Sequence, residues 1–204
     1  MKKQLIAGFV AVSVGLSVVA TTIAPSAGAT SNRPTERPTI TQIVAASGDG
    51  FDSNGSDYDI LLKAVVTANL ADTLNTPGLN VTVWAPNDRA FIRTARDLGF
   101  VGNDEAGAWG FLVTALTGLG NGDPIPVLTT ILKYHVTPES RGVLSVIFTR
   151  TFPTLAGPTI TRHFLTLVDQ DPDLPNPKLT LPLGVRASNG IIHTIDRVLI
   201  PINI

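Results

Sequence analysis

The pattern of secondary structure changes at Pro138, and this change constrains the fold more than any other feature of the sequence. Before Pro138, apolar residues recur at helical spacing, most clearly over 59–74, and one short strand is predicted over 80–86. After it come short β-branched stretches broken by Gly, Pro and Asp, which predict strands. These stretches cover 142–150, 154–162, 163–171, 178–184 and 190–200. Helices mainly before strands predict an α+β fold rather than a doubly wound parallel sheet.

The first residues have the pattern of a secretory signal peptide. Lys2 and Lys3 precede an apolar run over 5–24, and Ala27 and Ala29 occupy the small positions that a signal peptidase requires. We therefore predict a signal peptide over 1–29, a polar flexible leader over 30–38 and one domain over 39–204. No second apolar run of spanning length follows. The sequence predicts a secreted, extracellular protein with no membrane span after cleavage.

Charge and cysteine content exclude several classes of function. The formal net charge is −1, whereas proteins that bind nucleic acid through phosphate contacts carry a basic excess. The chain has no cysteine, which excludes disulfides, thiolate catalysis and cysteine-ligated zinc. We expect no nucleic-acid partner and no cofactor.

The stretch "NGIIHTIDRVLIP" near the end of the chain places His193 among branched apolar residues. On a strand, His193 and Ile195 face one side, whereas Thr194 and Asp196 face the other, so His193 and Asp196 are poorly placed to act as a pair. We expect a buried His193 with hydrogen-bonded ring nitrogens and an Asp196 that pairs with a basic residue or caps a turn. Asn189-Gly190 is a turn signal at the start of this strand.

Three stretches resemble the signatures of the fasciclin, or FAS1, domain family: "TVWAPNDRAF" at 82–91, "ILKYHV" at 131–136 and "NGIIHTIDRVLIP" at 189–201. Their order and spacing also agree with the family. The resemblance implies two β-sheets arranged as a wedge with helices around it. It assigns structural motif positions to Ala85, Pro86, Asn87, Phe91, Asn189, Gly190, His193 and Asp196.

The resemblance also implies an extracellular role in adhesion to cells or matrix. The family's Tyr-His element corresponds to Tyr134 and His135, for which both packing and a direct contact with a partner are predicted alternatives. The Asp-Ile pair that animal members use near the last signature is absent here, and no Arg-Gly-Asp occurs, so integrin binding is not expected.

The resulting prediction is a secreted, non-enzymatic interaction module whose partner is a cell-surface or matrix component. Neither a G-x-S-x-G elbow nor an H-E-x-x-H motif is present, and the three histidines are far apart in sequence. The alternative is a carrier of an apolar small molecule such as a carotenoid, as some fasciclin-like proteins are. Acidic loops at 49–59 and 169–173 suit solvated turns and helix caps, with calcium as the alternative.

Overall fold

A computed structural model describes residues 37–48 and 50–204. The predicted signal peptide, and the predicted leader as far as residue 36, lie outside the described residues. The described residues belong to one compact unit. The first tertiary hydrogen bond of the described chain is made by Pro38, whose carbonyl accepts from the Ser188 N–H. Among the described residues, no helix combines the length and apolar character needed to cross a lipid bilayer.

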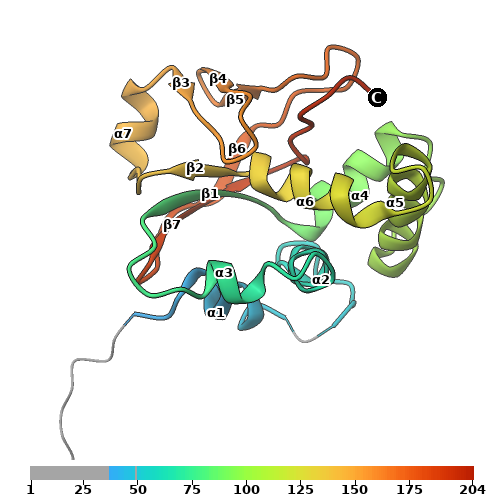
Figure 1. Ribbon diagram of the computed structural model, residues 1–204, viewed down its shortest axis with the longest axis horizontal. Helices are drawn as coiled ribbons and strands as arrows, with labels where there is room; N and C mark the ends of the chain where they lie inside the picture. The colour runs from blue at the N-terminus through green and yellow to red at the C-terminus, as the bar shows by residue number, and fades with distance from the viewer. Residues whose placement is uncertain (1–36, 49) are drawn as a thin grey trace, which may run out of the picture. The chain divides into compact units, whose positions relative to one another are not determined.

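Most helices come before Pro138 and most strands after it (Figure 1). The helices are α1 (Ile40–Ala45), α2 (Asp59–Thr67), α3 (Ala71–Leu74), α4 (Asp88–Asp97), α5 (Glu105–Leu119), α6 (Pro124–Tyr134) and α7 (Val143–Phe148). The strands are β1 (Val81–Pro86), β2 (Val136–Pro138), β3 (Thr151–Phe152), β4 (Ile160–His163), β5 (Thr166–Val168), β6 (Leu179–Arg186) and β7 (Gly190–Ile195). The predicted α+β class is confirmed.

Two sheets organise the fold. The larger has the strand order β2-β1-β7-β6, in which β1 and β7 run parallel and the outer pairs are antiparallel. The smaller has the order β3-β4-β5 and is antiparallel throughout. An isolated bridge between Thr166 and Lys178 joins the edges of the two sheets. The first and the last of the three family signatures therefore lie on neighbouring strands, because β1 carries the first and β7 the last.

Each face of the larger sheet covers a separate apolar core. Val81, Val83 and Ala85 of β1 face the core that includes α1, α2, α4, α5 and α6. Trp84 points the opposite way, into the core formed with α7, the smaller sheet and β6. Figure 1 shows α1–α3 and the smaller sheet on opposite sides of β1, β2 and β7. The strand predicted over 80–86 is confirmed as β1, and both of its faces are buried since each is covered by a different layer.

Two predicted elements are wrong. The stretch 142–150 was predicted as a strand, but Val143–Phe148 is a helix that begins after Gly142. In this helix only Val146 is buried, and the other large apolar side chains are exposed. Apolar residues therefore lie on the solvent side as well as the core side, and the sequence shows no helical periodicity. The single helix predicted over 59–74 is divided into α2 and α3, because Asn69 adopts a left-handed backbone with φ of 55°.

Candidate functional site

The first signature forms the connection between β1 and α4. Pro86 ends β1, and the Asn87 side chain then accepts a hydrogen bond from the Ala90 N–H at 3.0 Å, which caps α4. Ala85 and Phe91 are buried in the first core. All four motif residues thus act in packing and capping.

Asn189 and Gly190 join the last strand to the start of the domain. The buried Asn189 side chain accepts from the Ile40 N–H at 2.9 Å and donates to the carbonyls of Leu74 and Thr76. Gly190 pairs with Val81 of β1, and a Cβ at Gly190 would lie 2.5 Å from the Val81 carbonyl oxygen. Only glycine allows this approach, so the Asn-Gly pair fixes both α1 and the β1–β7 register.

His193 is 1% exposed and lies between Trp84 and two backbone groups. Its Nε2 lies 2.8 Å from the Arg141 carbonyl oxygen, so this nitrogen donates. Its Nδ1 accepts from the Gly184 N–H at 3.2 Å. The ring also stacks on Trp84 with a centroid distance of 5.5 Å. Burial lowers the pKa of His193, which keeps the ring neutral and structural.

Asp196 lies outside this arrangement. Its carboxylate accepts from the Lys178 N–H at 2.7 Å and forms ion pairs with Arg93 at 3.4 Å and Arg197 at 3.6 Å. Of the two alternatives predicted for Asp196, pairing with a basic residue is confirmed, whereas the bond to the Lys178 N–H, which is distant in sequence, is not a turn cap. His193 and Asp196 have separate partners and do not form a catalytic pair.

Tyr134 and His135 are buried, at 0% and 3% exposure. The His135 Nδ1 donates to the Ile131 carbonyl at 2.7 Å, and its Nε2 accepts from the Leu199 N–H at 2.9 Å. Burial lowers the pKa of His135 to about 4, so the ring is neutral at neutral pH. The Tyr134 hydroxyl donates to the Thr159 carbonyl at 3.2 Å. These contacts fit the alternative in which Tyr134 and His135 act in packing. A direct contact of either residue with a partner stays a prediction.

The two acidic loops differ in their environment. At 169–173, the Asp169 and Asp171 carboxylates accept from backbone N–H groups of residues 171, 173, 174, 200 and 204, as turn and cap residues do. In the other loop, Asp57 lies with Asp88 and Glu105, one carboxylate oxygen from each within 4.8 Å of the others. Burial and a hydrogen bond to Asp57 raise the pKa of Asp88 to about 8, so a proton is held there at neutral pH. Calcium stays an untested alternative.

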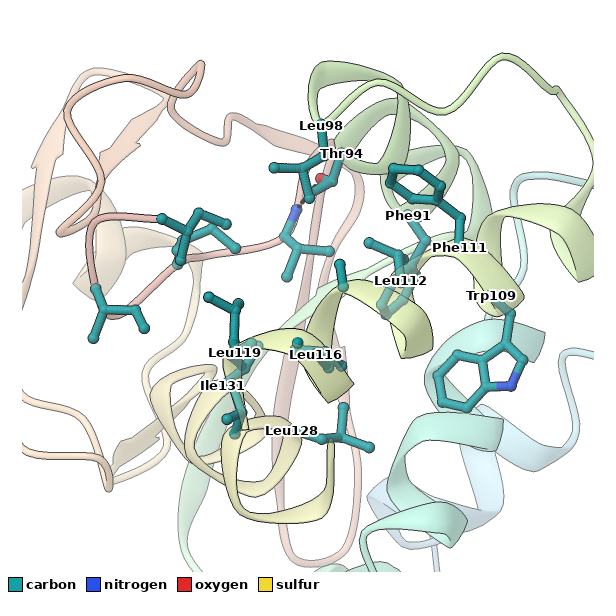
Figure 2. Close-up of a pocket in the computed structure, with 17 residues that line it drawn as sticks. Phe91, Thr94, Leu98, Trp109, Phe111, Leu112, Leu116, Leu119, Leu128 and Ile131 are labelled. Atoms are coloured by element: carbon teal, nitrogen blue, oxygen red, sulfur yellow. Dashed lines mark hydrogen bonds between the residues drawn. The ribbon is translucent and has the colours of Figure 1, made fainter. Parts of the chain in front are cut away.

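An apolar pocket of about 390 Å³ lies between α4, α5, α6 and the final residues of the chain. Figure 2 shows side chains of these three helices converging on it, among them Phe91, Leu112, Leu116, Leu128 and Ile131. Thr94 and Trp109 are the lining residues whose side chains carry a polar atom, and the Thr94 hydroxyl already accepts from the Val198 N–H at 3.0 Å. The pocket therefore suits a neutral, apolar molecule.

A second feature is an exposed apolar surface, formed by α7, the β4–β5 turn and β6. Phe148 is 84% exposed and Phe164 is 91% exposed. The surface consists of Leu144, Ile147, Phe148, Phe164, Leu165 and Leu181. The Arg162 guanidinium joins its segments by donating to the carbonyls of Ile147, Thr149 and Phe164, and the Leu179 N–H donates to the Leu165 carbonyl. Clustered exposure of this kind is typical of interaction sites.

Comparison with known proteins agrees with this fold. The profile of the fasciclin domain matches residues 56–201. The chain belongs to the fasciclin domain family. An uncharacterised protein of Synechocystis sp. is 29% identical over 147 residues, which cover 70% of this chain and 89% of that protein.

A solved structure of a FAS1 domain pair from the insect cell adhesion molecule Fasciclin I matches with a TM-score of 0.54 and 15% identity. The match covers 80% of this chain and 51% of that one, so this fasciclin protein spans about half the length of the structure. The resemblance inferred from the three signatures is confirmed for family and fold. Fasciclin domains are commonly adhesion-related, typically extracellular and generally non-enzymatic interaction modules.

Sequence reasoning identified the packing residues of this fasciclin domain but missed the pocket and the exposed apolar surface. The pocket has a partial signal, since α5 carries apolar residues around most of its circumference. The exposed surface had none, because an apolar run such as "VLSVIF" reads as a buried strand until the neighbours that leave it uncovered are known.

Proposed function

We propose that this protein is a secreted, non-enzymatic adhesion module that binds a cell-surface or matrix component. The family supports an interaction role. The observation that carries the proposal is the exposed apolar surface, where two phenylalanines and four aliphatic side chains contact solvent over three adjoining segments. Exposed apolar area of this extent has an energetic cost in water that binding a partner removes. Secretion is supported by the predicted signal peptide.

The test is binding of the purified protein without residues 1–29 to cells of the organism that produces it. A protein with Phe148→Glu and Phe164→Glu is expected to lose this binding. Both side chains are largely exposed, so the double variant is expected to keep the parent's stability to within about 1 kcal/mol. Val101→Glu is the matched control, since Val101 is fully exposed outside the surface. Equal binding by parent and double variant would reject the proposed adhesion surface.

A second candidate function is a carrier of an apolar small molecule such as a carotenoid. The observation that favours it is the apolar pocket, whose volume of about 390 Å³ falls in the range of ligand sites. Visible absorbance of protein purified from its native producer would detect a coloured ligand directly.

Trp109 provides a test that does not need the native ligand. The chain has two tryptophans, and Trp109 lines the pocket whereas Trp84 lies in the other core. Energy transfer from tryptophan to the neutral apolar probe N-phenyl-1-naphthylamine is therefore expected, and Trp109→Phe should weaken it more than Trp84→Phe, because transfer falls steeply with distance. Weaker transfer in Trp84→Phe than in Trp109→Phe would place the probe nearer Trp84 and argue against the carrier function.

A further inference from the structure

We propose that the exposed apolar surface docks this protein onto an anionic lipid bilayer, with Phe148 and Phe164 inserted among the lipid chains and arginines against the headgroups. This inference rests on the proposed adhesion function and names the partner of the same surface. The protein would lie on the membrane rather than span it, as monotopic proteins do.

Single apolar side chains of this surface project far into solvent. Phe148 closes α7 and Phe164 lies in the β4–β5 turn, and both have more than four fifths of their surface in solvent. Leu144 of α7 and Leu181 of β6 are also largely exposed, at 72% and 80%. A protein partner would need a shaped hollow for each of these side chains, whereas fluid lipid chains close around any projecting apolar group. Phenylalanine and leucine are the residues that interfacial segments bury in this way.

The segments that carry the surface are rich in basic residues. The segments that carry the surface, 139–168 and 178–186, contain Arg141, Arg150, Arg162, Lys178 and Arg186 but only one acid, Glu139. Glu139 forms an ion pair with Arg141 at 2.8 Å. These segments thus carry a net charge of +4 in a chain whose formal net charge is −1. Basic residues beside an apolar patch are attracted to anionic headgroups.

Hydrogen bonds from Arg162 hold the surface in place before it binds a partner. Arg162 donates through its Nε to the Thr149 carbonyl at 3.0 Å and through its Nη1 to the Phe164 carbonyl at 2.6 Å. Its Nη2 donates to the Ile147 carbonyl. One arginine therefore fixes the end of α7 against the β4–β5 turn, so that Phe148 and Phe164 keep their mutual position. A surface that is already ordered loses less conformational entropy when it binds.

The experiment is co-sedimentation of the protein without residues 1–29 with vesicles of phosphatidylcholine that contain about 30% phosphatidylglycerol. Removing those residues keeps the apolar run over 5–24 from binding lipid by itself. We expect the parent to bind, and Phe148→Glu with Phe164→Glu to lower the partition coefficient by at least about tenfold. Arg150→Ala with Arg186→Ala should weaken binding to these anionic vesicles several-fold. The same double variant should bind pure phosphatidylcholine vesicles about as well as the parent does. Val101→Glu should bind like the parent.

Other occupants of the surface give different results. No binding of the parent to the anionic vesicles, or equal binding by the double phenylalanine variant, overturns the lipid proposal. If the parent binds cells through Phe148 and Phe164 but not vesicles, the adhesion function stands and the partner is a protein or glycan. If the parent elutes as a dimer that the double variant converts to a monomer, and vesicles do not bind, the occupant is a second copy. Binding to vesicles without binding to cells would instead reject the adhesion function.

Discussion

His135 is expected to make the folded protein progressively less stable as the pH falls below about 6.5. The side chain is 3% exposed, and its Nε2 accepts a hydrogen bond from the Leu199 N–H, which a protonated ring cannot do. Burial lowers the pKa in the folded state to about 4. In the unfolded chain, a histidine takes up its proton near pH 6.5. Between these values the unfolded state binds the proton and the folded state does not, so acid favours unfolding.

The size of the effect follows from the two pKa values. A difference of one pKa unit corresponds to about 1.4 kcal/mol, so the full shift of His135 amounts to about 3 kcal/mol once the pH is below about 4. About 2 kcal/mol of this is lost between about pH 7.5 and about pH 5. Above about pH 7 the contribution of His135 to stability no longer changes with pH.

The assay compares the parent with His135→Gln by urea unfolding at several pH values. Glutamine does not titrate, and its constant effect on packing cancels when the difference between the two proteins is followed against pH. The comparison is needed because burial also raises the pKa of Asp169 to about 6, so uptake of a proton by Asp169 in the folded state works in the opposite direction over the same range. His193 titrates in both proteins alike and also cancels.

We expect the parent's advantage over His135→Gln to shrink by about 2 kcal/mol from about pH 7.5 to about pH 5. A constant difference over this range would show that His135 does not remain neutral and buried in the folded state. Retention of the parent's m-value by the variant serves as the control that both proteins unfold from an equally compact state.

Three further predictions concern the motif residues. His193→Ala is expected to lower the free energy of unfolding by about 2–4 kcal/mol in urea melts, because it leaves the Arg141 carbonyl and the Gly184 N–H unpaired and removes the ring stacked on Trp84; melting like the parent would contradict this. Asn189→Ala should lower it by about 2–3 kcal/mol through the loss of buried contacts to Ile40 and Leu74, and a loss below about 0.5 kcal/mol would refute the role of that amide. Arg93→Ala should change it by less than about 1 kcal/mol, because its ion pair with Asp196 is partly solvated and Asp196 keeps Arg197; a larger loss by the same assay would mean that the pair is structurally required.

Local chemistry explains why the signature residues were predictable. Asn87 follows a proline that ends a strand and precedes a helical stretch, so its capping role is visible in the sequence. The alternation of β1 and β7 separates Trp84 and His193 from Val83 and Thr194, and the two cores preserve that separation. His193 was expected to be buried and hydrogen-bonded because it stands among branched apolar residues, but its partners, Arg141 and Gly184, are distant in sequence and could not be named.

The sequence by itself thus determined the α+β class, the fasciclin family and the packing role of its signatures, since these depend on periodicity and on contacts between near neighbours. Tertiary structure alone decided that "VLSVIF" forms an exposed helix, that α4, α5 and α6 leave an apolar pocket, and that Arg162 joins the end of α7 to the β4–β5 turn. The physical reason is that exposure belongs to the assembled surface. An apolar side chain is buried or left in solvent by residues far away in the chain, and no local pattern specifies them.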